Sequence, residues 1–535
     1  MRLEHRSAVV LSAILLCTCT ATHVGSPDAG GPMSADSGVD AFFRARDARG
    51  PEDARMSDAE RVTDAELLDT GEPLDPRDWR PAFAPRVIYE NPDVRCAALP
   101  MDYSPPARSP TARGGVRWTY RPAADPRAVA RFAAMGLTDF FIDAYPFMAT
   151  ANGGVVVLAG YERDRVIVDH QGEFVGATSG IVSTNRMWIR GPDQTLVDQS
   201  EPGMSAHMQV LDGRDGSYGG IPSEAPGALP AFPGASWPSG PTGGQMPDPA
   251  LMPDGTILWA PTTSSLVASC VLDGRTRWIL EHDPSGWHQS RSIFATQDGE
   301  IIFAGTATYR IDGEGTVLAT RVAVDVNDAG LPVPHATIAW SQRCGLSRAI
   351  FEPETLALDG IEYWSGADFT DVRELRFPGS GVRGGQPTSD CAALVSTLSA
   401  GSFVVERVAP DGGTVFRRTL PPGHSSITAI ELSDGGFLFV QNGDPAPPAV
   451  TVYDTDGEIE LEAALDPDVV GMRFTHGAFM LTPDGTLYVA STSGLDERQQ
   501  IVAIEIGVGA TTPYPGSLEF RAGMNWARTN SAWHD

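Results

Sequence analysis

The chain contains no lysine. All 39 of its basic residues are arginine, against 68 acidic residues, and the formal net charge is −29. Without a lysine ammonium, Schiff-base catalysis, a lysine general base and a phosphate-binding P-loop are excluded. A surface this negative repels phosphate backbones and anionic headgroups, so we expect no nucleic-acid partner and no polybasic membrane contact.

Long hydrophobic runs are also missing. The apolar run at residues 8–16 follows two arginines, as in an export signal, and is too short to span a bilayer. It ends in Cys17 and Cys19, which resembles a bacterial lipoprotein signal. We expect residues 1–19 to be that signal, with Cys19 lipidated. Cys17, or ordinary secretion to the periplasm or the medium, is the alternative to an outer-membrane or cell-surface lipoprotein.

Residues 20–80 have few side chains that could join a core. Asp-Ala pairs recur there among Gly, Pro, Ser and Arg. Burial therefore cannot offset the entropy of ordering, and we expect a disordered acidic linker. In composition this spacer resembles the stalks of myxobacterial surface lipoproteins.

A short sequence motif is repeated through the rest of the chain. An Asp-Gly or Asn-Gly turn followed by a β-branched or aromatic run recurs about every 45 residues, as in a propeller or an array. The clear copies are Asn152-Gly153, Asp254-Gly255, Asp298-Gly299, Asp434-Gly435 and Asp484-Gly485. A second Asp-Gly turn follows within the unit, at Asp273-Gly274, Asp312-Gly313, Asp411-Gly412 and Asp456-Gly457. We expect type I′ hairpins, which need positive φ at both central residues.

Four antiparallel strands per unit predict a propeller blade. The fold class is therefore all-β, with residues 81–535 forming a β-propeller of eight four-stranded blades; seven is the alternative count. We expect a strand near residues 116–120 to close the ring by pairing with the last blade, which removes exposed sheet edges. A helix at residues 125–136 would cap one face.

Two passages carry a family resemblance. Residues 270–278, Cys-Val-Leu-Asp-Gly-Arg-Thr-Arg-Trp, are similar to the repeat of PQQ-like (quinoprotein-type) propellers, where an Asp-Gly turn precedes a strand ending in Trp. The segment 514–530 resembles their terminal Trp-Pro…Arg…Thr-Gly segment, with Tyr514 for the Trp and Asn530 for the last Gly. The chain lacks the adjacent cysteine pair and the lysine that would contact the quinone. The resemblance therefore implies a cofactor-free scaffold or binding module, with no PQQ.

Four cysteines remain after the signal: Cys96, Cys270, Cys344 and Cys391. An exported protein can form two disulfides from them, in three pairings. Cys344 and Cys391 have the same phase in neighbouring repeats, so we favour that pair and, with it, Cys96–Cys270. Four free thiols are the alternative.

The candidate site is a set of imidazoles and amides. His288, His335, His424 and His476 each lie shortly before the first turn of a repeat, where the chain enters the innermost strand, and Gln245 and Gln386 take similar places in two blades without the histidine. Such groups could converge at the channel mouth and bind Mn, Zn or Fe. Because a shift of one residue points a side chain to the opposite face, the uneven offsets favour isolated histidines instead.

The leading expectation is a monomeric, non-enzymatic, envelope-displayed module that binds a protein or a glycan, with residues 219–244 as the contact loop. The alternative is a metal-dependent polysaccharide lyase or hydrolase that uses the histidines as ligands. A quinoprotein dehydrogenase is a third, weaker reading.

Overall fold

The computed structural model describes residues 80–509 with gaps, the larger of which are 99–104, 135–147, 159–163, 180–186, 190–194, 200–207, 213–217, 221–249, 271–274, 284–291, 323–335, 353–357, 378–381 and 494–497. The expected signal peptide with Cys17 and Cys19, almost all of the expected linker, and the tail that resembles PQQ-like propellers lie outside the described residues.

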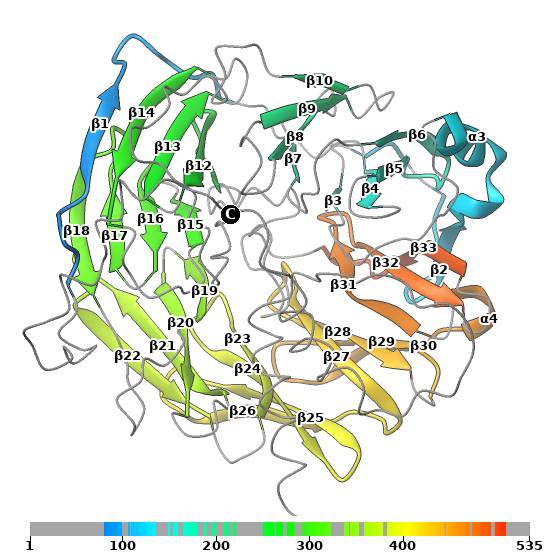
Figure 1. Cartoon of the computed structure of the whole chain (residues 1–535). Helices are drawn as coiled ribbons and strands as arrows, with labels where there is room; N and C mark the ends of the chain where they lie inside the picture. The colour runs from blue at the N-terminus through cyan, green and yellow to red at the C-terminus, as the bar shows by residue number, and fades with distance from the viewer. Residues whose placement is uncertain are drawn as a thin grey trace, which may run out of the picture.

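The described strands form eight sheets, numbered here in chain order, which stand around a common centre (Figure 1). Sheet 1 contains β3 (Met148–Ala149), β4 (Val155–Leu158), β5 (Asp164–Val168) and β6 (Phe174–Ser179). Sheet 2 contains β7 (Met187–Ile189), β8 (Thr195–Gln199), β9 (Met208–Asp212) and β10 (Tyr218–Gly220). Sheet 3 contains β11 (Ala250–Leu251), β12 (Thr256–Thr262), β13 (Ser265–Cys270), β14 (Thr276–Glu281) and, as a fifth strand, β1 (Arg86–Glu90).

The next three sheets follow without interruption along the chain. Sheet 4 contains β15 (Ser292–Ala295), β16 (Ile301–Ala304), β17 (Ala307–Ile311) and β18 (Val317–Val322). Sheet 5 contains β19 (Ala336–Ser341), β20 (Gly345–Phe351), β21 (Leu358–Ser365) and β22 (Asp371–Arg376). Sheet 6 contains β23 (Val382–Pro387), β24 (Ala393–Ser399), β25 (Ser402–Val408) and β26 (Thr414–Thr419).

The last two sheets lead to the closure of the ring. Sheet 7 contains β27 (His424–Glu431), β28 (Phe437–Gly443), β29 (Ala449–Tyr453) and β30 (Ile459–Ala464), after which α4 (Pro467–Val470) follows. Sheet 8 contains β31 (Arg473–Leu481), β32 (Thr486–Ser493), β33 (Arg498–Glu505) and β2 (Val116–Tyr120). All paired strands are antiparallel. In each sheet the strand named first above is the innermost, and β1 and β2 lie on the outer edges of sheets 3 and 8 (Figure 1). The β-propeller expected from the sequence is confirmed.

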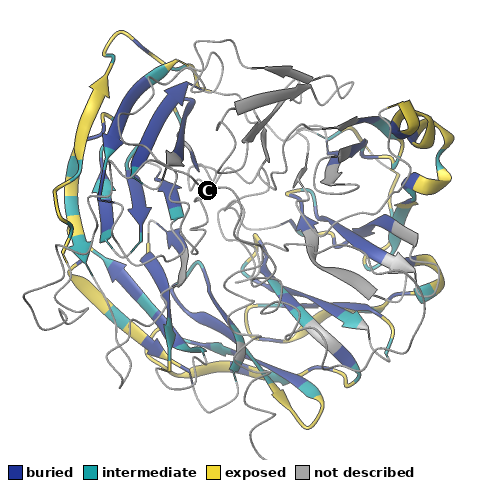
Figure 2. Cartoon of the chain, viewed as in Figure 1, coloured by how far each residue is buried: buried dark blue, intermediate teal, exposed yellow. Residues whose placement is uncertain are grey.

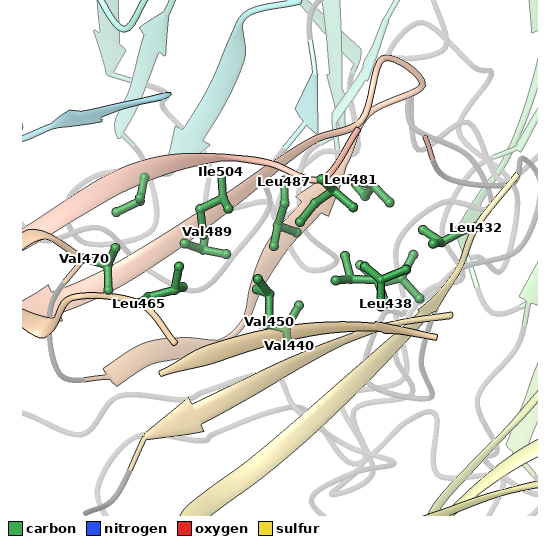
Figure 3. Close-up of a cluster of buried hydrophobic side chains, with 14 residues drawn as sticks. Leu432, Leu438, Val440, Val450, Leu465, Val470, Leu481, Leu487, Val489 and Ile504 are labelled. Atoms are coloured by element: carbon green, nitrogen blue, oxygen red, sulfur yellow. The ribbon is translucent and has the colours of Figure 1, made fainter. Parts of the chain in front are cut away.

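The hydrophobic core lies between neighbouring sheets. In sheets 3 to 8 the described residues of the middle strands are mostly buried, and those of the outer strands are mostly half-buried or exposed (Figure 2). One cluster joins Leu438, Val440 and Val450 of sheet 7 to Leu487 and Val489 of sheet 8 (Figure 3). Because antiparallel strands alternate their side chains between two faces, each of these sheets can contribute to a layer on either side. Among the described residues, each pair of neighbouring sheets from 3 to 8 therefore shares a hydrophobic cluster of its own.

The turns differ from the expected type I′ hairpins. In the second turn of sheet 4, Asp312 opens a four-residue turn, and it is Gly315, with φ +89°, that has the left-handed conformation. Asp312 Oδ1 accepts hydrogen bonds from the backbone N–H groups of Glu314 and Thr316, and the register shifts beside the turn. This is the pattern of a turn that ends in a glycine bulge. Aspartate is used here for its side-chain acceptor, and only the glycine needs positive φ.

The ring is closed by a strand that precedes the first sheet. β2 pairs with β33 in sheet 8, with Thr119 opposite Val502, so the closure predicted for residues 116–120 is confirmed. The helix α3 (Pro126–Ala134) confirms the predicted helix, but it packs against β6 at the rim rather than over a face (Figure 1). Arg131 Nε donates to the carbonyl of Ala177 in β6 at 3.0 Å.

A recurrent contact fastens one sheet to the next. Trp278 of sheet 3 donates from Nε1 to the carbonyl of Gly313 in sheet 4 at 2.9 Å, and Trp118 of sheet 8 donates to the carbonyl of His170 in sheet 1 at 3.0 Å. Each indole covers the bulge glycine of the turn that it meets. A methyl group at Gly172 would lie 2.7 Å from Cδ2 of Trp118. Each of these two indoles thus requires a glycine at the turn of the neighbouring sheet that it meets.

Candidate functional site

Only part of the predicted histidine and glutamine set falls on described residues. His288, His335 and Gln245 lie outside them, and His476 lies in β31, where only the backbone is described. His424 and Gln386 are both described and buried. The geometry of the set can therefore be examined at these two positions.

His424 is the first residue of the inner strand β27, as expected for a residue that enters a sheet. Its ring is 8 % exposed, and its Nδ1 has no hydrogen-bond partner among the described residues. Burial lowers the pKa of this imidazole, and a hydrogen bond to the backbone of Asn442 acts in the opposite direction. The ring is thus held neutral at physiological pH, the state in which an imidazole nitrogen can bind a metal.

Gln386 does not share the place of His424. It is the last residue but one of β23, whereas His424 begins β27, so the two side chains lie at opposite ends of neighbouring inner strands. Four or five residues of extended chain correspond to roughly 15 Å. The expectation that Gln386 takes a similar place was wrong, because its distance to the following turn is much shorter than that of the histidines.

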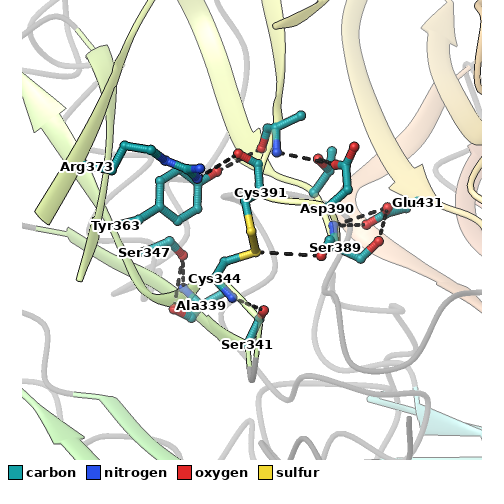
Figure 4. The surroundings of a disulfide bond; sticks show 12 residues. Ala339, Ser341, Cys344, Ser347, Tyr363, Arg373, Ser389, Asp390, Cys391 and Glu431 are labelled. Carbon is teal, nitrogen blue, oxygen red and sulfur yellow. Dashed lines mark hydrogen bonds between the residues drawn. A yellow bond between two sulfur atoms is a disulfide. The ribbon is translucent and has the colours of Figure 1, made fainter. Parts of the chain in front are cut away.

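A second polar cluster lies where sheets 5, 6 and 7 meet, around the disulfide that the sequence analysis favoured (Figure 4). A disulfide joins Cys344 of sheet 5 to Cys391 of sheet 6. The adjacent Ser389 donates to Glu431 of sheet 7 from its backbone N–H at 2.9 Å and from its hydroxyl at 2.7 Å. Tyr363 donates to the carbonyl of Ala392 at 2.8 Å. The short turn between β23 and β24 is therefore held from both sides.

Charge at this junction is arranged around Glu431, which is 3 % exposed. Burial raises the pKa of its carboxyl to about 7, and the hydrogen bonds from Ser389 act in the opposite direction. Nearby Asp390 is held by Arg407 at 2.6 Å, and its pKa is lowered by hydrogen bonds from Thr388 and by that guanidinium, against the effect of burial. The cluster therefore contains two acids whose pKa values move in opposite directions.

We expect Glu431 to make the protein less stable as the pH rises from about 4.5 to about 7, since the folded state binds this proton more tightly than the unfolded state. The effect on the free energy of unfolding has an upper limit of about 3 kcal/mol. In Glu431→Gln the amide still accepts from Ser389 but does not titrate, so that part of the pH dependence should vanish. Urea unfolding at several pH values measures it.

The control for this experiment is Glu460→Gln, on the exposed surface of β30, which should keep the pH profile of the parent protein. If Glu431→Gln and the parent gave the same slope across this pH window, the proposed protonation of Glu431 would be refuted.

Two searches of the described residues were negative. No group of three or more His, Cys, Asp or Glu side chains in the described part of the chain has the spacing of a metal site. Among those same residues, no helix has the length and apolar character needed to cross a membrane.

No protein-family model matches the chain, and no curated protein matches it. Solved β-propellers are similar to it in structure. The WD40 domain of Sif2 (8 % identity, TM-score 0.40) covers 68 % of this chain and 98 % of its own. BamB from Moraxella catarrhalis (14 %, 0.35) covers 68 % and 93 %. An inactive virginiamycin B lyase from Staphylococcus aureus, solved with quinupristin (10 %, 0.33), covers 68 % and 98 %. These likenesses are too distant to indicate what this chain binds.

Proposed function

We propose that the protein is a non-enzymatic β-propeller, of the PQQ-like type without cofactor, displayed at the cell envelope, and that it binds a protein or a glycan through its loop face. The observation that carries this proposal is the way in which the sheets are fastened. Trp278, Trp118 and the Cys344–Cys391 disulfide each tie one sheet to the next. A ring fastened in this way keeps its loops in fixed relative positions, and a preorganised surface loses little entropy on binding.

The location at the envelope is supported by the amino terminus and by the cysteines. The apolar run after Arg2 and Arg6 ends at Cys19 and is followed by an acidic spacer. Disulfides persist in oxidising compartments, and the structure pairs Cys96 with Cys270 and Cys344 with Cys391. These are the pairs that the sequence analysis favoured. We propose export, with lipidation at Cys19.

The contact surface is proposed to include residues 219–244. This segment begins with the last two residues of β10 (Tyr218–Gly220) and ends before β11, which begins at Ala250. A long connection between two sheets of a rigid ring is where binding residues are usually placed, because it can vary without disturbing the core.

The test immobilises the secreted form of the full chain and exposes it to envelope proteins and, separately, to an array of polysaccharides. We expect saturable capture that is lost when residues 219–244 are replaced by a short glycine-serine link. Val415→Ser, on the exposed outer strand β26, should leave capture unchanged. Capture that survives the loop replacement would contradict the proposed surface.

One observation favours a second candidate, a metal-dependent lyase or hydrolase acting on an extracellular polysaccharide. The Nδ1 atom of His424 is buried without a hydrogen-bond partner among the described residues, as a ligand atom awaiting a metal would be. The metal would also need ligands from His288, His335 and His476.

Elemental analysis of untagged, chelator-free protein tests this candidate. If it is correct, we expect about one transition metal per chain, lost in His335→Ala with His424→Ala, since a closed site takes four ligands. Under the binding proposal the metal content stays at background. If the double variant retained the metal, His335 and His424 would not be its ligands.

A further inference from the structure

Residues 80–98, which precede the ring, form a strap along sheet 3. Near the start of the strap, the backbone N–H of Ala82 donates to the carboxylate of Asp283, which follows β14. The middle of the strap is β1, which pairs with β14. Near its end Cys96 is bonded to Cys270, the last residue of β13. The strap is therefore attached to sheet 3 at its start, in its middle and near its end.

The noncovalent part of this attachment is weak. Strand β1 has only five residues, all of them exposed, and its pairing with β14 shifts register between Val87 and Tyr89. The guanidinium of Arg86 lies 2.8 Å from Glu281, but the arginine side chain is 71 % exposed, and an exposed ion pair contributes little to stability. A pull on the preceding chain can therefore detach β1 from its sheet, whereas the disulfide is a covalent bond.

The next strand after the strap is the one that closes the ring. β2 is the outer edge of sheet 8 and pairs only with β33 among the described strands. It also makes two contacts with sheet 1: Trp118 donates to the carbonyl of His170, and the ring of Tyr120 stacks on Phe174 at 6.5 Å. Loss of β2 would leave β33 as an open edge and would loosen the junction between sheets 8 and 1.

The strap and β2 lie far apart in the ring, although few residues separate them in sequence. Ala97 lies so close to Gly255 of sheet 3 that a side chain at this glycine would clash with its carbonyl. Gly114 lies against Ala463 of sheet 7 and donates to the carbonyl of Glu505 in sheet 8 at 2.7 Å. Figure 1 shows β1 and β2 on opposite sides of the ring. Without the disulfide, a pull that detached the strap would pass along the chain to β2.

We propose that the disulfide between Cys96 and Cys270 is a mechanical stop, which transfers a pull on the chain before residue 80 to sheet 3 and keeps it from β2. The order of the elements supports this, because Cys96 lies between the weakly held β1 and the closing strand. The ring then stays closed when its amino-terminal chain is under load. The proposal goes beyond the binding function, and it does not depend on lipidation at Cys19.

Stretching single molecules of the secreted chain between an amino-terminal handle and Leu318→Cys tests the proposal. Leu318 is exposed on β18 of sheet 4, so the load enters the ring through either sheet 3 or sheet 8. In the parent protein, freeing residues 80–96 should give a first extension of about 55 Å that ends at Cys96, at about 3.4 Å per residue. In Cys96→Ala with Cys270→Ala, residues 80–120 should be freed before any larger unfolding event, for a total of about 140 Å.

The matched control is Cys344→Ala with Cys391→Ala, which removes the other disulfide and leaves the strap bonded to sheet 3. This control should keep the short extension, and reducing the parent protein with a dithiol should convert the short extension into the long one. If the variant without the Cys96–Cys270 bond still stopped near 55 Å, the load would not reach β2 and the proposal would be wrong. Equal extensions in the two double variants, or a ring that opens before the strap detaches, would also overturn it.

Discussion

Replacing Trp278 with alanine is expected to lower the free energy of unfolding by about 3–5 kcal/mol, the usual cost of removing a large buried aromatic side chain. The indole is 1 % exposed and packs in the cluster shared by sheets 3 and 4. Its loss also removes the donor to the carbonyl of Gly313. Because the side chain contacts both sheets, the substitution should loosen their junction, which hydrogen exchange on β14 and β17 would detect alongside chemical unfolding.

A conservative variant, Trp278→Phe, and a surface control, Leu318→Ala, help to interpret the effect of Trp278→Ala. Trp278→Phe keeps most of the apolar contact with Gly315 but leaves the Gly313 carbonyl unpaired, so we expect a smaller loss of about 1–3 kcal/mol. Leu318→Ala, on exposed β18, should change the stability by less than about 0.5 kcal/mol. If Trp278→Ala cost no more than Leu318→Ala, the indole would not be the fastening between these sheets.

The repeat explains why the architecture could be predicted from the sequence. A turn that ends in glycine, such as the one closed by Gly255 or Gly485, fixes where one strand ends and the next begins. Alternating apolar residues between such turns then assign the faces that pack. The closing strand was predictable for a similar reason, since a ring with a free edge on its last sheet needs a partner for β33.

The features that were missed depend on contacts distant in sequence. The turn type follows from hydrogen bonds between Asp312 and the residues after it, and an Asp-Gly pair alone does not specify which glycine takes positive φ. The strand β1 lies outside the repeated Asp-Gly pattern, and it pairs with β14 across all of sheets 1 and 2 and most of sheet 3 in the sequence. Residues 81–115 are therefore included in the propeller by the sequence analysis, but no strand is predicted among them.

The candidate site was predictable only in part. The sequence placed His424 correctly at the start of an inner strand, but it gave Gln386 the wrong end of its strand. Glu431 could not be recognised from the sequence, since an acid next to a turn is ordinarily solvated. Its raised pKa arises from burial between sheets 6 and 7, which outweighs the opposing effect of the hydrogen bonds from Ser389, and only the assembled ring provides both.

Removing the disulfide between Cys344 and Cys391 should lower the free energy of unfolding by about as much as Trp278→Ala. The two cysteines are 47 residues apart, and a crosslink of that span lowers the entropy of the unfolded chain by about 4 kcal/mol at room temperature in the chain-entropy model. We expect Cys344→Ala with Cys391→Ala to lose about that much stability in chemical unfolding. Reducing the parent protein should produce a larger loss, because it also breaks the disulfide between Cys96 and Cys270, and thiol counting should find none of these four cysteines free before reduction.

The backbone at Cys391 provides a matched variant. Its φ of +68° is one that L side chains rarely adopt, and it occupies the turn position that glycine takes in sheets 1, 3, 4, 5, 7 and 8. Cys344→Ala with Cys391→Gly should therefore be about 1 kcal/mol more stable than Cys344→Ala with Cys391→Ala, because glycine reaches this conformation without strain. Equal stability of the two would mean that the turn relaxes once the disulfide is absent. A stability of both equal to the parent would show that the pair does not fasten the sheets. A cysteine at a glycine position is thus explained by the bond that it forms across the junction, where the ring exchanges an unstrained turn for a covalent link between neighbouring sheets.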